Sequence, residues 1–158
     1  MQPRIEAFSV EPKLMQSLLK LEETITASGL EQSLIELVKI RASQINACAY
    51  CLHMHTADAL AQGERVERLL LLDAWQESTL FTAREKAALG WVEALTNVGA
   101  THAPDEDFDA LKPAFSESEI VKLTLLIGMI NLWNRVCVGL RAVHPADIEG
   151  AEDKRRQL

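Results

Sequence analysis

The residues of this sequence with the clearest chemical potential lie between positions 46 and 55, where the chain reads Asn-Ala-Cys-Ala-Tyr-Cys-Leu-His-Met-His. Cys48 and Cys51 stand three residues apart, and His55 follows four residues after the second cysteine. Two thiols at this spacing can close a disulfide after one of them is oxidised to a sulfenate. They can also ligate a metal ion, so the motif predicts either a redox pair or a metal site.

A helix would place all three side chains on one face. If Asn46 is the N-cap, a helix runs from there to about Gln62, where the glycine that follows provides a left-handed stop. At about 100° per residue, Cys51 and His55 lie within about 60° of Cys48 around the helix axis. The free N–H groups of the first turn and a nearby imidazole lower a cysteine pKa from about 8.5 into the range of roughly 3.5 to 7.5. The motif therefore favours a thiolate at neutral pH.

The rest of the chain supplies helices that position this motif, because its apolar residues recur at helical spacing and no segment alternates with period two for long enough to form a strand. Further helices are predicted over about residues 11–28, 31–44, 64–75, 82–99 and 116–141, with a short one after Pro104. Two of them open with capping boxes, Thr82-Ala83-Arg84-Glu85 and Ser116-Glu117-Ser118-Glu119. The predicted fold class is all-α, a bundle of about six to seven helices. One domain is expected over residues 1–158, with a flexible tail from about residue 145.

Composition narrows the classes of function. A chain of 158 residues with 48% hydrophobic and 25% charged content is typical of a soluble globular domain. Sixteen basic and 23 acidic side chains give a net charge of −7 without a basic stripe, which argues against nucleic acid and anionic membranes as partners. The chain start lacks an apolar signal segment, and the most apolar run, Leu123–Ile130, is too short to span a bilayer. Three cysteines do not make a secreted disulfide framework, so a cytoplasmic location is expected.

The segments around the motif resemble a known family. Residues 34–55, 82–89 and 130–135 are similar to the alkyl hydroperoxidase D (AhpD) branch of the carboxymuconolactone decarboxylase family. In that branch a glutamate, a C-x-x-C pair and a histidine form a proton-relay site that reduces small hydroperoxides. The matching positions here are Glu36, Cys48, Cys51 and His55. Tyr50 departs from the pattern, because better-known peroxidase members carry a histidine just before the second cysteine.

The resemblance implies an AhpD-like helical bundle, together with roles and partners. Cys51 is predicted to be the peroxidatic thiol, because it lies deeper in the helix and one turn from His55. Cys48 is predicted to be the resolving thiol, because it lies at the helix start, where it is more open to a reductant. The implied reductant is a dithiol donor, either a lipoyl carrier or a thioredoxin-like protein, and no cofactor or metal is implied. Relatives assemble into rings, and the predicted helices at 31–44 and 116–141 are apolar over more than half their circumference. We therefore expect a homo-oligomer, a trimer or a hexamer.

Several alternatives remain open at the motif. A C-x-x-C pair with a nearby histidine can hold structural zinc, with His53 or Glu36 as the fourth ligand, although His53 faces away from the cysteines. The helical wheel places Glu36 on a polar stripe with Lys39, which indicates a solvent-facing carboxylate paired with that lysine. The resemblance instead places Glu36 against His55, where it would hold the imidazole ready to accept the thiol proton.

Several residues outside the motif are predicted to have structural rather than catalytic roles. Cys137 is interpreted as a small buried hydrophobic residue of the last helix. Trp133, Asn134 and Arg135 are expected to pack and hydrogen-bond against the motif helix rather than to act in catalysis. Two other functions remain possible for the chain as a whole: a lactone-cleaving lyase, since the same fold serves γ-carboxymuconolactone decarboxylase, and a redox sensor without enzymatic activity.

Overall fold

The computed structural model describes residues 2–144, and every regular element in that range is a helix. The long helices are α2 (Pro12–Thr26), α3 (Gln32–Ile45), α4 (Ala49–Ala61), α6 (Ala83–Thr96) and α9 (Glu117–Leu140). The short elements are α1 (Ala7–Val10), α5 (Val66–Leu70), a 3₁₀ turn η1 (Leu72–Ala74), α7 (Val98–Thr101) and α8 (Asp105–Leu111). The all-α prediction is confirmed, and the unexpected one-turn helices α1 and α7 bring the α-helices within residues 2–144 to nine. The predicted flexible tail lies outside the described residues.

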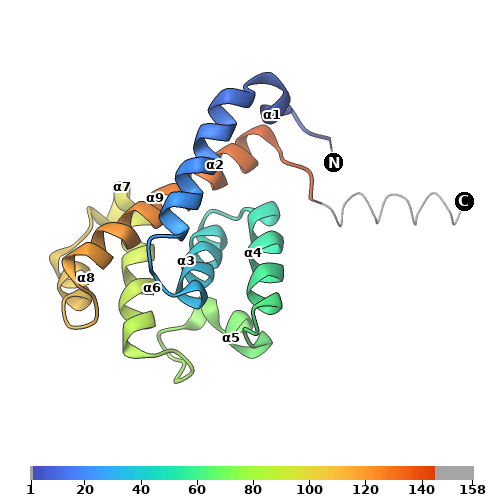
Figure 1. Ribbon diagram of the computed structural model, residues 1–158. Helices are drawn as coiled ribbons and strands as arrows, with labels where there is room; N and C mark the ends of the chain where they lie inside the picture. The colour runs from blue at the N-terminus through green and yellow to red at the C-terminus, as the bar shows by residue number, and fades with distance from the viewer. Residues whose placement is uncertain (1, 145–158) are drawn as a thin grey trace, which may run out of the picture.

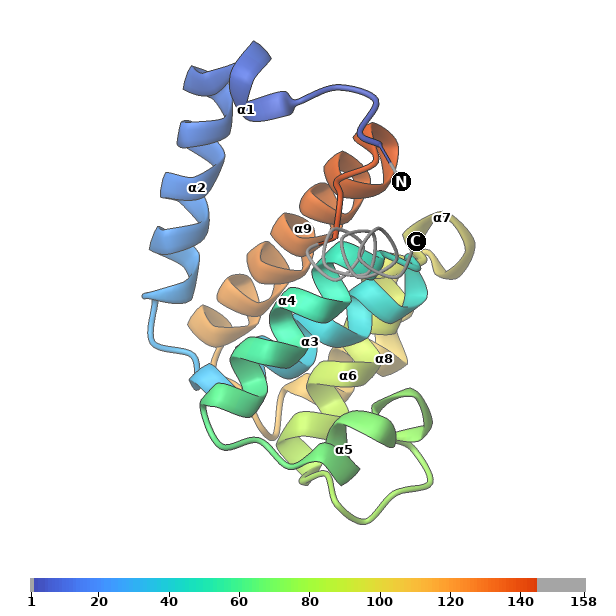
Figure 2. The same cartoon turned by 90° about the vertical axis from the view of Figure 1, so that its right-hand side faces the viewer.

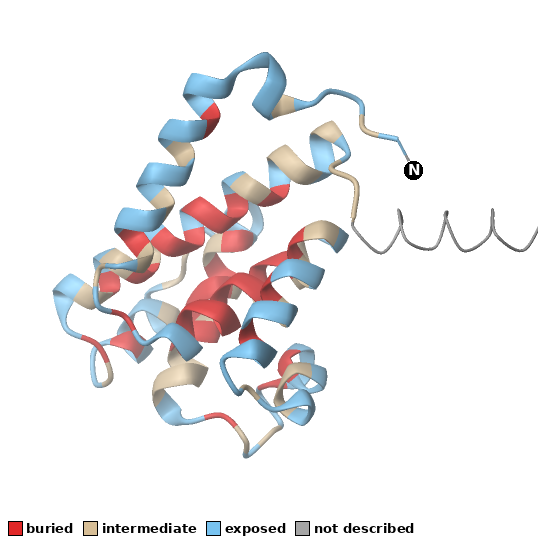
Figure 3. Ribbon diagram, turned by 45° about the vertical axis from the view of Figure 1, so that its right-hand side comes forward, coloured by how far each residue is buried: buried red, intermediate tan, exposed pale blue. Residues whose placement is uncertain are grey.

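Helix α3 is the centre of the arrangement (Figure 1). It packs against α4 on one side and against α6 and α9 on others, and α6 also packs against α8 and α9. Helices α1 and α2 form an arm at the edge of the bundle, and α2 meets α9 (Figure 2). Buried residues concentrate on α3 and on the inner face of α9 (Figure 3). The motif helix α4 therefore lies directly against the most buried element of the chain.

Two hydrophobic clusters meet on α3. Ile35 and Val38 face a cluster that includes Leu126 of α9, whereas Leu37 and Ile40 face a second cluster that includes residues of α4, η1 and α6. This confirms the sequence-based prediction of a helix buried on more than one side. The apolar surface of α3 is covered within the chain itself, so it leaves no patch for a partner subunit. Exposed apolar side chains occur instead on α1, α2 and α9.

The segment predicted as one helix over residues 64–75 is divided into α5 and η1. Leu72 and Trp75 are both buried in the second cluster. Residues three apart eclipse each other in a 3₁₀ turn, which directs both side chains to the same side. The predicted helix over residues 82–99 likewise ends early, at Thr96. The packing of Leu72 and Trp75, rather than local propensity, sets the boundary between α5 and η1.

Both predicted capping boxes are present. Thr82 and Glu85 open α6, and Ser116 and Glu119 open α9, each with reciprocal side chain to backbone hydrogen bonds. Arg84 of α6 also donates to Glu119 at 2.7 Å, which ties the starts of the two helices together. The backbone N–H of Ser116 and then the Arg84 guanidinium lower the pKa of Glu119 to about 2. The local signals in the sequence therefore located these helix starts correctly.

Helix α9 is, by length and composition alone, apolar enough to cross a membrane. This differs from the expectation drawn from the run Leu123–Ile130, because the complete helix has 24 residues. In the structure Leu123, Leu126 and Ile127 are buried in the cluster shared with α3 and α6. Helix α9 thus serves as a core helix of the bundle.

Candidate active site

The connection from α3 to α4 fixes the position of the first cysteine. Helix α3 ends in a Schellman motif, in which the N–H of Cys48 donates to the Ser43 carbonyl at 3.0 Å and the N–H of Ala47 donates to the Gln44 carbonyl at 3.1 Å. Ala47 adopts the left-handed conformation that this motif needs, with φ of 51°. Cys48 is therefore the N-cap of α4, whereas Asn46 caps the C-terminus of α3. The prediction of Asn46 as N-cap is wrong, because the left-handed residue delays the next helix by two positions.

Ala47 allows a test of this connection. An alanine in the left-handed region is strained, whereas glycine is not, so Ala47→Gly is expected to raise the free energy of unfolding by about 0.5–1 kcal/mol. For a domain of this size that corresponds to an increase in Tm of about 1–4 °C. The matched control is Ala49→Gly, which lies within helix α4 and is also exposed, and it should lower the Tm. Equal losses in both variants would contradict the assignment of strain to Ala47.

Cys48 and Cys51 form a disulfide, with their Cα atoms 5.4 Å apart. The backbone N–H of Cys51 donates to Cys48 Sγ at 3.3 Å, as expected for a sulfur at a helix N-cap. Both residues are only about 1% exposed. Cys48 is thus no more open to solvent than Cys51, contrary to the prediction, because the Schellman turn folds it under the start of α4.

Glu36 of α3 and His55 of α4 form a buried pair. Glu36 Oε2 lies 3.1 Å from His55 Nδ1, and Gln32 Nε2 donates to the other carboxylate oxygen at 2.9 Å. Glu36 and His55 are each 4% exposed. The solvent-facing interpretation of Glu36 is therefore wrong, and so is its pairing with Lys39, whose Nζ donates to Glu22 of α2 at 2.7 Å. The polar stripe of α3 is covered because α4 and α2 bring matching polar groups to it.

This pairing determines which nitrogen of the His55 ring carries the hydrogen. A carboxylate only accepts hydrogen bonds, so His55 Nδ1 carries the hydrogen that faces Glu36. Nε2 is then the nitrogen with a free lone pair, and it can accept a proton. A carboxylate that orients an imidazole in this way is a common arrangement in general-base catalysis.

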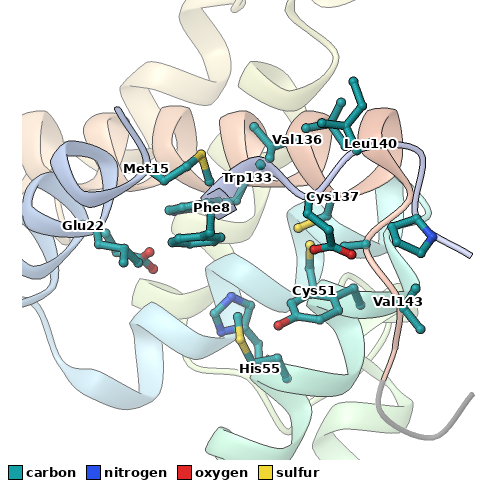
Figure 4. A pocket seen from close by; sticks show the side chains of 18 residues that line it. Phe8, Met15, Glu22, Cys51, His55, Trp133, Val136, Cys137, Leu140 and Val143 are labelled. Atoms are coloured by element: carbon teal, nitrogen blue, oxygen red, sulfur yellow. The ribbon is translucent and has the colours of Figure 1, made fainter. Parts of the chain in front are cut away.

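A cavity of about 450 Å³ opens beside the disulfide and the imidazole (Figure 4). The arm of α1 and α2, helix α4 and helix α9 form its walls, and most lining side chains are apolar, among them Phe8, Met15, Leu19, Met54, Trp133 and Val136. Cys51 and His55 both line the cavity. The indole Nε1 of Trp133 is buried and has no hydrogen-bond partner among residues 2–144. The cavity therefore places a mostly apolar space beside Cys51 and His55.

A network of polar side chains anchors the α3–α4 connection to α9. Asn46 Nδ2 donates to Asn131 Oδ1 at 3.0 Å and to Asn134 Oδ1 at 2.9 Å. Asn134 Nδ2 donates to Ser43 Oγ at 3.0 Å, and Asn131 Nδ2 donates to Thr96 Oγ1 of α6 at 3.0 Å. Asn134 was expected to bond the motif helix, but it holds the turn that precedes that helix. The network fixes Cys48 indirectly, through Ser43 and Asn46 at the end of α3.

Comparison with known proteins places this arrangement in a family. The sequence profile described as the carboxymuconolactone decarboxylase family matches residues 12–94, over half of the chain. The protein YdfG of Bacillus subtilis (strain 168) is 35% identical over 140 residues, which cover 89% of this chain and 95% of YdfG. The chain belongs to the carboxymuconolactone decarboxylase family. This confirms the resemblance inferred from the sequence.

Solved structures support the fold of this family member. ATU0492 from Agrobacterium tumefaciens, a protein of unknown function that has been suggested to be the antioxidant defence protein AhpD, superimposes with a TM-score of 0.89 and 42% identity. The match covers 91% of this chain and 99% of ATU0492. The debrominase Bmp8 superimposes with a TM-score of 0.78 over 92% of this chain and 78% of Bmp8, at 21% identity, which shows a shared fold alone. The AhpD-like helical bundle is therefore confirmed.

The structure assembles the four positions that match the AhpD branch of the family. Glu36 contacts His55, Cys48 is bonded to Cys51, and His55 lies in the same cavity wall as Cys51. Tyr50, which replaces the histidine of better-known members, also lines the cavity. The geometry is that of a disulfide beside an oriented imidazole.

Within residues 2–144, two groups of side chains have ligand atoms close enough for a metal ion. The sulfurs of Cys48, Cys51 and Cys137 lie within 4.8 Å of one another, and so do ligand atoms of Glu36, His55 and Asp58. In the first group two sulfurs share a disulfide and are not thiolates, the form that binds metal. That group also contains neither His53 nor Glu36, the fourth ligands that the zinc alternative needs. With Cys48 and Cys51 joined in a disulfide, these three sulfurs fit redox chemistry better than zinc binding.

Cys137 is the residue of this site that the sequence analysis missed. Its sulfur lies beside the disulfide, and the residue is half-buried in the wall of the cavity (Figure 4). Burial raises the pKa of the Cys137 thiol. The only signal in the sequence for its role was a third cysteine in an apolar helix. Helical periodicity alone places such a residue in the hydrophobic core.

The raised pKa predicts slow alkylation of Cys137. In the disulfide form it is the free cysteine of the chain, so labelling by iodoacetamide reports it alone. Because burial favours the neutral thiol, the labelling rate should reach half of its maximum above pH 8.5, the usual midpoint for a cysteine. Mass spectrometry of samples quenched between pH 7 and 10 measures this rate. A half-maximal rate at or below pH 8.5 would contradict the prediction, and Cys137→Ala provides the unlabelled control.

Proposed function

We propose that this protein is a thiol-dependent hydroperoxide reductase of the AhpD type. The observation that carries the proposal is the arrangement of Cys51 and the Glu36–His55 pair at one wall of an apolar cavity, with Cys48 bonded to Cys51. This arrangement supplies a nucleophile, a base, an orienting carboxylate and a second thiol. Family membership supports the same function, since ATU0492 has been suggested to be an antioxidant defence protein.

The first chemical step uses the reduced dithiol. His55 Nε2 accepts the proton of the Cys51 thiol, directly or through water, while Glu36 stabilises the imidazolium that forms. The Cys51 thiolate attacks the terminal oxygen of a hydroperoxide, so that an S–O bond forms and the O–O bond breaks. The imidazolium returns its proton to the departing alkoxide. The products are an alcohol and a Cys51 sulfenic acid.

The second step closes the disulfide that the structure contains. Cys48 attacks the sulfenic sulfur of Cys51, the S–S bond forms and the oxygen leaves as water with the thiol proton. The Cys51 N–H that points to Cys48 Sγ stabilises the Cys48 thiolate for this attack. A dithiol donor, a lipoyl carrier or a thioredoxin-like protein, then reduces the disulfide by two successive exchanges and is itself oxidised to a disulfide. The proposed compartment is the cytoplasm, where thiols are kept reduced.

Thiol counting tests the proposal. The fully reduced protein has three thiols, and one equivalent of cumene hydroperoxide should leave one, without bound metal in the same sample. Reduced lipoamide should restore all three and support repeated turnover. Loss of two thiols without turnover would favour a redox sensor instead. A lyase would cleave ring-cleavage lactones undiminished in the double variant Cys48→Ser/Cys51→Ser, and that result would overturn the redox function.

We also propose that the protein works as a homo-oligomer, a trimer or a hexamer. Exposed apolar side chains lie on the arm, at Leu14 and Leu21, and on α9, at Val121 and Leu125. Because α2 and α9 contact each other, these exposed apolar side chains support an interface with another copy of the chain. Light scattering with an activity assay measures the assembly, and a fully active species of 17.6 kDa at micromolar concentration would contradict it.

A further inference from the structure

Three sulfur atoms from two helices meet at the inner end of the cavity. Cys48 and Cys51 belong to the start of α4, and Cys137 belongs to the last turns of α9, yet the three sulfurs lie within 4.8 Å of one another. The sulfurs of Cys51 and Cys137 face each other in Figure 4, and both residues line the cavity. The mechanism above uses only two of these thiols.

The three cysteines differ in access. Cys48 and Cys51 are each about 1% exposed, whereas Cys137 is only half-buried. A thiol reductant must place its sulfur in line with the disulfide that it attacks, which two fully buried sulfurs resist. Cys137 already occupies a position beside that disulfide and is also closer to solvent.

We propose that Cys137 is a third redox thiol, which exchanges with the Cys48–Cys51 disulfide by attack on Cys51 Sγ. The Cys137 thiol loses its proton to water, its sulfur bonds to Cys51, and the bond between Cys48 and Cys51 breaks with Cys48 leaving as a thiolate. Cys48 then takes up a proton. One disulfide is exchanged for another, so the step needs no external oxidant or reductant. It goes beyond the proposed peroxide chemistry and does not depend on it.

The surroundings favour Cys48 as the leaving group. Its sulfur accepts the N–H of Cys51 at the N-terminus of α4, and such a donor stabilises a thiolate. A sulfur that is stable as a thiolate leaves faster in exchange. Burial raises the pKa of Cys137, which keeps it mostly protonated at neutral pH and makes its attack slow. The product disulfide would link α4 to α9 and release Cys48 for the next exchange.

The variant Cys48→Ser isolates the proposed bond. Its two remaining thiols are Cys51 and Cys137, and oxidation with the azo reagent diamide should remove both within the same molecule. Trypsin separates the peptides 42–65 and 136–141, so a disulfide between them is read directly by mass spectrometry. We expect this link to form within about tenfold of the rate at which wild-type protein closes Cys48–Cys51. An alkylatable Cys137 alongside an intermolecular Cys51 disulfide would overturn the proposal.

Two further measurements keep the test specific. Cys51→Ser, which retains Cys48 and Cys137, should form its link at least about tenfold more slowly, and an equal or faster rate would overturn attack at Cys51. Wild-type protein, oxidised with diamide and quenched in acid, should contain a minor fraction of linked peptides 42–65 and 136–141 with Cys48 alkylated. The Cys137→Ala protein sets the background, and a wild-type signal no higher than it would overturn the proposal even if a variant misfolded.

Discussion

Replacing Cys51 by serine is expected to lower the rate of hydroperoxide reduction by at least about 10³-fold. A serine hydroxyl is not ionised by the neighbouring imidazole at neutral pH, so the attacking group is lost while the cavity and the Glu36–His55 pair remain. Stopped-flow measurement of peroxide consumption by the reduced protein gives the rate.

The matched comparison separates attack from resolution. In the double variant Cys48→Ser/Cys137→Ala, Cys51 is the single remaining cysteine, and the first turnover should proceed within a few-fold of the wild-type rate. It should stop at a sulfenic acid that dimedone traps on the peptide 42–65. A sulfenic acid on Cys48 in the Cys51→Ser protein, formed at the wild-type rate, would exchange the two roles.

Replacing Glu36 by glutamine is expected to lower the rate of Cys51 oxidation by about 10²–10⁴-fold, the range that general acid–base catalysis contributes. The upper end, about 10⁴-fold, is the loss found when the carboxylate partner of a catalytic histidine is made neutral. The amide no longer forces the hydrogen onto His55 Nδ1, and it does not stabilise the imidazolium that forms as Cys51 loses its proton. The rate of Cys51 alkylation in the reduced protein should fall in parallel, because alkylation needs the same thiolate.

Asp58→Asn is the control for this variant. It removes the same charge from a carboxylate within 4.8 Å of the Glu36–His55 ligand atoms, but Asp58 is exposed. Its rate should stay within about threefold of wild type, since an exposed charge in water interacts weakly. A loss in Asp58→Asn as large as that in Glu36→Gln would show that net charge, and not the hydrogen bond to Nδ1, controls the thiol. Melting temperatures of both variants identify any loss that arises from unfolding.

The sequence alone determined two local features of this protein, the helical motif and the helix starts at Thr82 and Ser116. The spacing of Cys48, Cys51 and His55 predicted one helix face, and in the structure all three lie at the start or in the first turns of α4. The capping boxes at Thr82 and Ser116 predicted the starts of α6 and α9. These features depend on hydrogen bonds and periodicity within a few residues, so neighbouring sequence is sufficient to predict them.

Tertiary structure decided which polar residues entered the site. Glu36 and Lys39 look like a solvent-facing stripe on α3, and they are buried only because His55 and Glu22 arrive from α4 and α2. A buried charge is tolerated only with a partner, and the wheel of a single helix does not contain that partner. The position of Cys137 beside the disulfide depends in the same way on how α9 packs against α4, because Cys51 and Cys137 are 86 residues apart in the chain.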